Sequence, residues 1–298
     1  MKKYVFQLMV LLMLVSTAFF SCKKTVDKIN PDLSAKIDAA FPESDNAVII
    51  MPDFDVSGVF RTDGNDEKYN TFYGPQVQMG NGHIRSWINI THGGKPLAIG
   101  VEMTDGSLAN LNSMGTFTLR LHQKANNVTP FDHITLNWNM RGHEPPHVYD
   151  VPHFDFHFYK ISVADQMAIP PYIVAPAKFN HNPPAGYMPS LYLNPGGGVP
   201  MMGAHWIDLL SPEVQPPASP NHAAFTHTFI YGSYDGAVTF VEPMITHALL
   251  NAGTMVHKWY RQPLYFSPTG TNYPQRYNIW KDASNGRHYV SLDQMLMR

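Results

Sequence analysis

Four histidines lie within one eighteen-residue stretch near the middle of the chain, GHEPPHVYDVPHFDFHFY, which runs from Gly142 to Tyr159. The same stretch holds three acidic and five aromatic residues, whereas the whole chain of 298 residues has 15 histidines. Imidazole and carboxylate groups bind zinc and related transition metals, and they also perform general acid–base chemistry. This stretch is therefore the first candidate for a functional site.

The second half of the stretch has the alternation of a β-strand, because polar and aromatic residues follow one another with a period of two. On a strand the polar members share one face: His153, Asp155, His157 and Tyr159. The phenylalanines share the other face: Phe154, Phe156 and Phe158. We expect the phenylalanines to enter the core and the polar face to look into a cleft.

Strand geometry restricts which of these side chains can bind one ion. At a rise of about 3.3 Å per residue, positions four apart are separated by roughly 13 Å, which is too far for two imidazoles to share a metal. His153 and His157 should therefore not bind the same ion unless a bulge intervenes. We expect Asp155 with one of the two histidines, while the other supports the ligands or belongs to a second site.

Further ligands must come from the loop that precedes the strand or from elsewhere in the chain. The loop offers His143, Glu144 and His147, and distant segments offer His205 and Glu242. A set of nitrogen and oxygen ligands without sulfur favours zinc, with manganese, iron or copper as alternatives. Copper deserves mention because Met201 and Met202 stand close to His205 in the sequence, although methionines more often fill a core.

Two other interpretations of the histidine-rich stretch remain open. The histidines could hydrogen-bond to carboxylates and backbone and so hold an irregular loop on the sheet, or a His–carboxylate pair could perform metal-free acid–base chemistry. Covalent catalysis has no support, because the motifs GxSxG, HExxH and the P-loop are all absent. The remaining strand and turn histidines are expected to have ordinary surface or structural roles: His83, His92, His122 and His133.

The N-terminus has the layout of an export signal, with Lys2 and Lys3, an apolar run to Phe20, and a small Ser21. Cys22, the only cysteine, stands where a bacterial lipoprotein signal is cut and its cysteine lipidated. Because Phe20 replaces the usual small residue, an uncleaved anchor helix or simple secretion remain alternatives. We predict a signal peptide over residues 1–21, lipidation of Cys22, a polar tether over 22–45, and a location in the periplasm or on the outer-membrane surface.

Composition limits the other classes of function. Without the two lysines of the signal, 19 basic and 23 acidic residues remain, so we expect no nucleic-acid binding. A lipidated Cys22 leaves no disulfide, so the body must be stabilised by its core. Membrane contact is expected through the lipid anchor only.

The rest of the chain predicts a mainly β fold with few short helices. We expect strands over 83–90, 96–103, 117–122, 131–140 and 153–159, a hairpin over 225–241, and strands near 255–260, 275–280 and 288–292. Short helices are predicted after Ser162 and from Glu242-Pro243 to Leu250. Residues 170–222 contain twelve prolines and predict a long ordered loop. We therefore predict one β-rich domain over 46–298, an antiparallel β-sandwich or a barrel-like body.

Three long motifs, GHEPPHVYDVPHFDFHFY, MGAHWIDLLSPE and IYGSYDGAVTFVEPMIT, together with Trp138, resemble a poorly characterised family of secreted bacterial β-rich proteins. That family is typified by a Thermus protein of the sigma-E, or envelope-stress, regulon, and the resemblance runs from about Gly74 to Leu250. It implies an exported homo-oligomer without an established activity, and it departs at His147, where a small residue is expected. By matching motifs it implies a site made of His143, Glu144, His153, Asp155, His157, His205 and Glu242.

Three hypotheses for the function follow. The leading one is a lipid-anchored envelope protein with a His/carboxylate metal site and a binding or stress role. The second is a metal-dependent hydrolase or lyase in which the ion activates water and Glu144 or Asp155 acts as base. The third is a metal-free structural oligomer.

Overall fold

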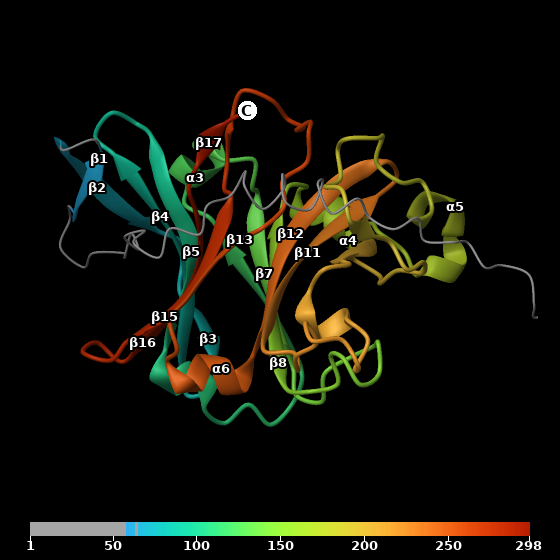
Figure 1. The fold of residues 1–298 in the computed structure, drawn as a ribbon. Coiled ribbons are helices and arrows are strands. Elements are labelled where there is room, and N and C mark those ends of the chain that lie inside the picture. The colour runs from blue at the N-terminus through green and yellow to red at the C-terminus, as the bar shows by residue number, and fades with distance from the viewer. Residues whose placement is uncertain (1–57, 63–64) are drawn as a thin grey trace, which may run out of the picture. The chain divides into compact units, whose positions relative to one another are not determined.

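Two antiparallel β-sheets pack against each other in the computed structural model, which describes residues 58–62 and 65–298 (Figure 1). The predicted signal peptide, the lipidation site Cys22, the tether and the start of the domain lie outside the described residues. Among the described residues, no helix is both long and apolar enough to cross a membrane.

The first sheet has the strand order β1-β2-β4-β5-β16-β15-β13, and the short β3 also pairs with β4. Its strands are β1 (Gly58–Thr62), β2 (Asn65–Tyr73), β3 (Val77–Met79), β4 (Gly82–Thr91), β5 (Pro96–Thr104), β13 (Val256–Trp259), β15 (Arg276–Asp282) and β16 (Arg287–Asp293). The N-terminal strands and the C-terminal strands thus share one sheet, because β5 pairs with β16.

The second sheet has the order β6-β7-β8-β12-β11-β10-β9 and carries the histidine-rich strand near its middle. Its strands are β6 (Gly115–Arg120), β7 (His133–Asn139), β8 (His153–Tyr159), β9 (Tyr192–Leu193), β10 (Ala204–Asp208), β11 (His227–Tyr234) and β12 (Ala237–Thr246). Both sheets are open, so of the two predicted alternatives the sandwich is confirmed and a closed barrel is not formed.

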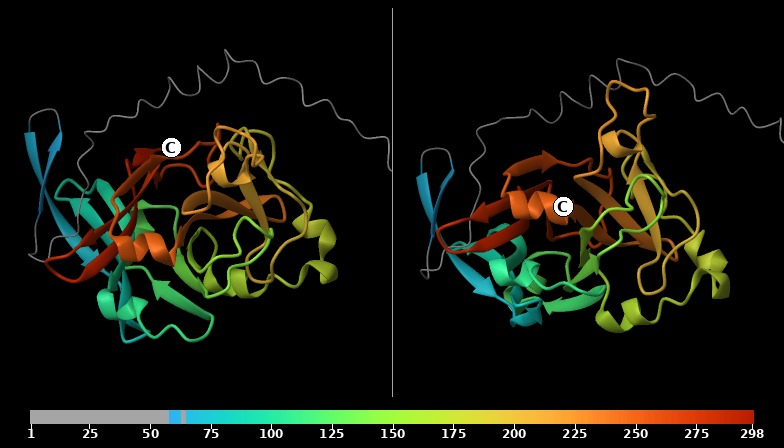
Figure 2. Two further views of the ribbon diagram at one scale, coloured as in Figure 1. Left: turned by 60° about the horizontal axis from the view of Figure 1, so that its bottom comes forward. Right: turned by 90° about the horizontal axis from the view of Figure 1, so that it is seen from below.

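The helices are short and lie outside the sheets. They are α3 (Gln123–Val128), α4 (Val163–Met167), α5 (Pro176–Phe179) and α6 (His247–Ala252), with single 3-10 turns at Asp105–Leu108, Tyr172–Val174 and Pro212–Val214. A small separate pair joins β14 (Asn272–Tyr273) to β17 (Leu296–Met297). Figure 2 brings forward the end of the sandwich that holds α6 and the loop 141–152.

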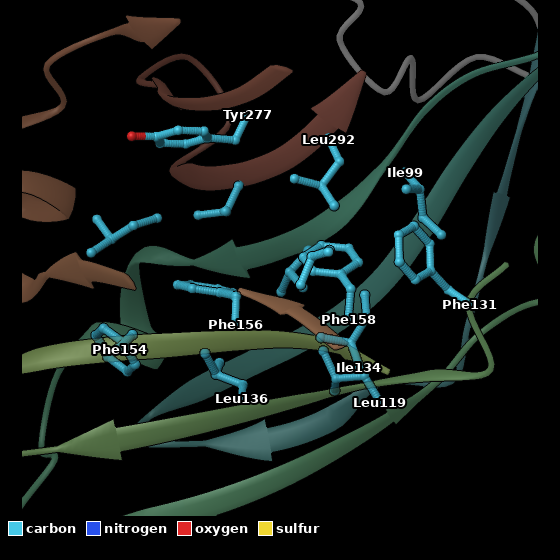
Figure 3. Close-up of a cluster of buried hydrophobic side chains, with 14 of the residues drawn as sticks. Ile99, Leu119, Phe131, Ile134, Leu136, Phe154, Phe156, Phe158, Tyr277 and Leu292 are labelled. Atoms are coloured by element: carbon cyan, nitrogen blue, oxygen red, sulfur yellow. The ribbon is translucent and has the colours of Figure 1, made fainter. Parts of the chain in front are cut away.

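The core fills the space between the sheets with aliphatic and aromatic side chains from both. Phe154, Phe156 and Phe158 on β8 are fully buried and point into this core, beside Leu136 and Leu292 (Figure 3). Burying a phenylalanine fully contributes about 1.5–3 kcal/mol relative to leaving it exposed. The prediction that the phenylalanines of this strand enter the core is therefore confirmed. Because they do so, the opposite face of β8, with its polar residues, is turned away from the core.

Most predicted elements are present within one or two residues, including the α4 helix, whose Ser162 side chain accepts from the Asp165 backbone N–H. The helix predicted from Glu242-Pro243 is wrong. Both residues belong to β12, and the helix begins only at His247, after a Thr246 cap. In the sequence, the proline resembled a residue of the first turn of a helix. Proline lacks a backbone N–H, but β12 tolerates it because residues 242 and 243 are not paired with β8.

The outer face of the second sheet is covered by the Pro-rich segment after β8. The Tyr159 hydroxyl donates to the Met201 carbonyl across this face, and Gln166 of α4 contacts the ring of His133. Figure 1 shows the same segment, with α4 and α5, beside β11 and β12 on the side away from the first sheet. The segment 170–222 is ordered, as predicted, and helps to bury the polar face of β8, but it is not one continuous loop because it contains α5, β9 and β10.

Candidate metal centre

The polar face of β8 is buried although it lies outside the core. His153, Asp155 and His157 are each less than 5% exposed. The register with β7 sets Asn139 opposite His153 and Thr135 opposite His157. Buried charges and imidazoles require partners, so the contacts of these side chains decide what the face can do.

The first cluster joins His143, His153 and Asp155, whose ligand atoms lie within 4.8 Å of one another. His153 Nε2 is 3.1 Å from Asp155 Oδ1, and His143 Nε2 is 3.6 Å from Asp155 Oδ2. Donors around a tetrahedral zinc ion are separated by about 3.4 Å for bonds of 2.0–2.2 Å. These separations therefore suit one ion after small movements of the side chains.

Both imidazoles of this cluster turn Nε2 toward the carboxylate because Nδ1 is held by a backbone carbonyl. His153 Nδ1 donates to the Val151 carbonyl at 2.7 Å, and His143 Nδ1 donates to the Glu144 carbonyl at 2.7 Å. Metal-bound histidines commonly have this arrangement, in which the second nitrogen donates to a carbonyl and fixes the tautomer. With Nδ1 engaged in this way, both imidazoles direct Nε2 toward Asp155 and could bind a metal through that atom.

The loop 142–152 places His143 over the end of β8 by closing on itself. His143 N–H donates to the Tyr149 carbonyl, and Gly142 has a φ of 69°. A side chain at Gly142 would meet that same Tyr149 carbonyl at 2.0 Å, so only glycine allows the closure. The His143 side chain remains 38% exposed and gives the cluster a route to solvent.

The second cluster joins His157, His205 and Glu242, again with ligand atoms within 4.8 Å of one another. His157 Nε2 is 3.3 Å from Glu242 Oε2, and His205 Nε2 is 3.9 Å from the same oxygen. His157 and Glu242 are almost completely buried, whereas the His205 side chain is 23% exposed. This set also supplies two nitrogens and one carboxylate.

Strand register explains how three distant residues meet in the second cluster. The pairs that flank the gap in the β8–β12 ladder place Glu242 of β12 across from His157 of β8. His205 lies on β10, which is separated from β12 by β11, and it pairs with Gly232 of β11. Because Gly232 has no side chain, the Phe240 ring occupies the space above it, and this ring contacts both histidines with centroid distances of 4.8 and 5.3 Å.

The two clusters differ in their electrostatics. Burial lowers the pKa of His157 to about 3 and that of His205 to about 4, since the charge of Asp155 opposes burial only in part. Burial and the charge of Asp155 raise the pKa of Glu242 well above its usual value. Both imidazoles of the second cluster are therefore neutral at pH 7, which is the form that coordinates a metal.

In the first cluster the ionised carboxylate is favoured instead. Burial raises the pKa of Asp155, but the contacts with His143 and His153 outweigh it and hold the pKa well below its usual range. Burial lowers the pKa of His143, and Asp155 reverses this so that the net pKa is raised. Asn139 also donates to Asp155 Oδ2 at 2.5 Å. Without a metal, the ionised Asp155 is stabilised by its contacts with the two histidines and Asn139, although its Oδ1 makes no hydrogen bond.

Unsatisfied polar atoms are more numerous in the second cluster than in the first, where Asp155 Oδ1 is the one buried ligand atom without a hydrogen bond. Neither ring nitrogen of His157 nor Oε2 of Glu242 makes a hydrogen bond, although the Thr135 carbonyl lies close enough to raise the pKa of the ring. Leaving a buried polar group without a partner costs about 1–3 kcal/mol, and more for a charged group. A divalent cation bound by these atoms would remove that cost, so the residues fit a metal.

Six of the seven positions that the motifs imply as a site enter the two clusters. His143, His153, Asp155 and His157 come from the expected loop and strand, whereas His205 and Glu242 come from strands that were not predicted at those residues. The carboxylate of Glu144 joins neither cluster, although the Glu144 carbonyl accepts from His143 Nδ1 and the charge of Glu144 helps to raise the pKa of His143. His147 is also outside both, with a φ of 67° and a fully exposed ring near Asp150. A backbone with positive φ favours a small residue at position 147. This position therefore belongs to a turn and not to a ligand set.

Two contributors were missed by reasoning from the sequence. Asn139 lies one strand away from Asp155, and Gly232 gives Phe240 its place between the histidines. The alternation in β7 could have indicated Asn139, since it shares a face with Asn137. No local pattern marks Gly232, because its role depends on the pairing of three strands.

Comparison of the chain with protein-family models, with curated proteins and with solved structures finds no match. The resemblance described above therefore stays an expectation, and the argument for function must come from the geometry of the two clusters.

Proposed function

We propose that this protein is an exported, lipid-anchored metal-binding protein of the cell envelope. Its second cluster, His157, His205 and Glu242, would hold a divalent transition ion, with zinc preferred. The observation that carries the proposal is the buried contact of His157 with Glu242, in which neither facing atom has a hydrogen bond. The first cluster would hold a second ion.

The donor set supports zinc over harder or softer ions. Each cluster offers two imidazole nitrogens and a carboxylate oxygen, and neither contains a thiolate. Magnesium and calcium prefer sites made of oxygen, and copper(I) prefers sulfur. Met202 is half-buried beside β10, and Met244 of β12 pairs with Asp155 of β8, but the donors that define both clusters are nitrogen and oxygen atoms. The copper alternative suggested by the sequence is therefore less well supported than zinc.

Elemental analysis of the purified protein tests the proposal directly. We expect between one and two equivalents of zinc after expression with zinc in the medium. Less than about a tenth of an equivalent of any transition metal would overturn the proposal and favour the metal-free structural oligomer. Loss of metal in His157→Ala, with unchanged metal in His83→Ala, would assign the ion to the second cluster, since His83 is exposed on the other sheet.

A metal-dependent hydrolase or lyase is the second candidate, and one observation favours it. Each cluster provides three protein donors, as catalytic zinc sites do, whereas structural zinc sites generally have four. Bound metal would supply Lewis acidity and would lower the pKa of water. Of the two bases considered from the sequence, Asp155 is a ligand candidate of the first cluster whose charge reaches Glu242 of the second, whereas Glu144 lies outside both clusters beside His143.

Cobalt substitution separates these two functions. The visible spectrum of the cobalt protein should change on addition of azide if a coordination position is open. A spectrum that azide does not change would indicate a closed metal shell and would remove the enzymatic candidate. The metal-binding proposal would remain in that case.

The envelope location rests on the sequence around Cys22, which lies outside the described residues. We expect the full-length protein to incorporate labelled palmitate in a bacterial host and to sediment with membranes. The Cys22→Ser variant should lose the label and enter the soluble fraction. Label that persists in Cys22→Ser would exclude lipidation at this cysteine, and membrane association without label would indicate an anchor helix. A role in envelope stress rests on the family resemblance alone.

A further inference from the structure

A cavity of about 280 Å³ opens at the end of the sandwich where β8 stops, opposite the end that carries the loop 141–152. Its floor is formed by core residues of both layers, Phe131, Tyr231, Val241 and Tyr260. Two connecting segments form its walls, one around residues 183–187 and one over 262–274. None of the metal-cluster residues lines it, so it is a separate site.

The walls of this cavity are rich in aromatic rings and proline. Tyr187 and Tyr265 lie with ring centroids 5.7 Å apart, and the Tyr265 N–H donates to the Gly186 carbonyl, which joins the two segments. Phe266 and Tyr273 form a second tilted pair at 4.6 Å. Walls fixed in this way lower the entropy lost when a ligand binds.

Three tyrosines of the cavity floor and wall have hydroxyl groups that already donate hydrogen bonds, so they offer their rings to a ligand. The Tyr231 hydroxyl donates to the Arg261 carbonyl at 2.9 Å, and the Tyr273 hydroxyl donates to the Pro268 carbonyl at 2.7 Å. Tyr260 likewise donates to the Pro274 carbonyl. The interior therefore offers mostly apolar and aromatic surface, as in binding sites for small organic molecules.

Lys160 is the one charged side chain among the described residues that line the cavity. It follows Tyr159 directly, so the alternation of β8 places it on the same side as Phe158, toward the space between the sheets. Its Nζ lies 5.6 Å from the centroid of the Tyr273 ring. Burial lowers the pKa of Lys160 to about 8, and no charged neighbour in the described part of the chain contributes.

The Lys160 ammonium thus lies in an aromatic cavity whose described lining residues include no carboxylate to balance its charge. A ligand that supplies one carboxylate would form a charge-assisted hydrogen bond with it, and a ring system would stack on the walls. We propose that this cavity binds a small aromatic monocarboxylate, with Lys160 contacting the carboxylate. The site is independent of the metal-binding function.

Binding of two matched probes to the purified full-length protein tests this proposal. We would measure naphthalene-2-carboxylate and the neutral 2-naphthylmethanol by titration calorimetry at pH 7. We expect the carboxylate to bind about tenfold more tightly or better, since hydrogen bonds to charged groups exceed neutral ones. In Lys160→Met this preference should disappear, while the affinity for 2-naphthylmethanol should stay within about twofold.

Two further variants make the result specific. Lys124→Met is the matched control, because Lys124 also lies over an aromatic ring, Phe72, at 5.0 Å, but is exposed and outside the cavity. It should keep the preference for the carboxylate. Ala237→Trp places a large side chain at the cavity lining and should abolish binding of both probes at unchanged melting temperature.

Three outcomes would overturn the proposal. They are failure of the wild-type protein to bind either probe at millimolar concentration, a preference for the carboxylate that survives in Lys160→Met, and binding that persists in a folded Ala237→Trp protein.

Discussion

His157 of β8 faces Glu242 of β12 at the point where the pairing of these two central strands is interrupted. Their facing atoms, Nε2 and Oε2, are 3.3 Å apart, buried, and without a hydrogen bond. Pro243 follows Glu242 directly and has no backbone N–H to offer to a ladder. The strand irregularity and the unsatisfied pair thus occur together, which is common where a sheet carries a functional site.

Glu242→Gln should abolish metal binding at the second cluster without harming the metal-free fold. Burial and the charge of Asp155 raise the pKa of Glu242 and so favour its neutral carboxyl in the metal-free protein, which glutamine matches closely in shape and charge. We expect the unfolding free energy without metal to change by less than about 1 kcal/mol. Zinc at 100 times its dissociation constant should stabilise the wild-type protein by about 2.7 kcal/mol, or roughly 5–10 °C, and this gain should shrink in the variant.

Glu213→Gln is the control for that experiment. Glu213 is buried, its pKa is raised chiefly by burial, and it contacts Tyr149 outside both clusters. Its zinc-dependent stabilisation should match that of the wild-type protein. Equal zinc responses of Glu242→Gln and the wild-type protein would show that this carboxylate is not a ligand.

Replacing one histidine of each cluster should show that each cluster binds its own metal ion. His153→Ala removes a donor from the first cluster, and His205→Ala removes one from the second. Each should lower the zinc content by up to one equivalent, and the double variant should bind almost none. The check is elemental analysis after dialysis. Complete loss in either single variant would instead show one shared centre.

Gly232→Ala should weaken the second cluster from a distance. An added Cβ would lie 2.0 Å from the Phe240 ring, which contacts both His157 and His205. We expect a loss of about 1–3 kcal/mol in unfolding free energy from overpacking and a weaker zinc affinity. Zinc retained by the first cluster would be unaffected. Gly94→Ala is the comparison, because the space around Gly94 is open, although its φ of 87° adds its own strain.

Some features of the fold and of the candidate site can be predicted from the sequence because they depend on a few neighbouring residues. The period-two alternation of β8 assigns Phe156 to the core and His157 to the opposite face, and the structure confirms both. The rise of a strand also excludes a shared ion for His153 and His157, and they do fall into different clusters. Periodicity, rise and donor chemistry are properties of a few adjacent residues, so no fold is needed to infer them.

The features that could not be predicted from the sequence depend on contacts between distant segments of the chain. Glu242-Pro243 has the local pattern of a helix start, yet the neighbouring strands hold it in β12. His205 reaches the site only because β10 pairs with β11 at Gly232. Lys160 was not recognised at all, since one lysine after a strand has no distinctive pattern until the loops over 183–187 and 262–274 enclose it.

Binding of naphthalene-2-carboxylate should weaken as the pH rises through the pKa of Lys160. Burial lowers that pKa from 10.5 to about 8, so the ammonium that attracts the carboxylate is present below pH 8 and is lost above it. If only the charged form binds tightly, the dissociation constant should rise about tenfold between pH 7 and pH 9.

Three buried tyrosines of the cavity floor and wall do not titrate in this interval. Burial raises the pKa of Tyr231, Tyr260 and Tyr273 above that of free tyrosine. Calorimetric titrations at several pH values provide the check, with Lys160→Met and 2-naphthylmethanol as two pH-independent references. A dissociation constant that stays constant for the carboxylate in the wild-type protein from pH 7 to pH 9 would show that the Lys160 ammonium does not recognise the ligand.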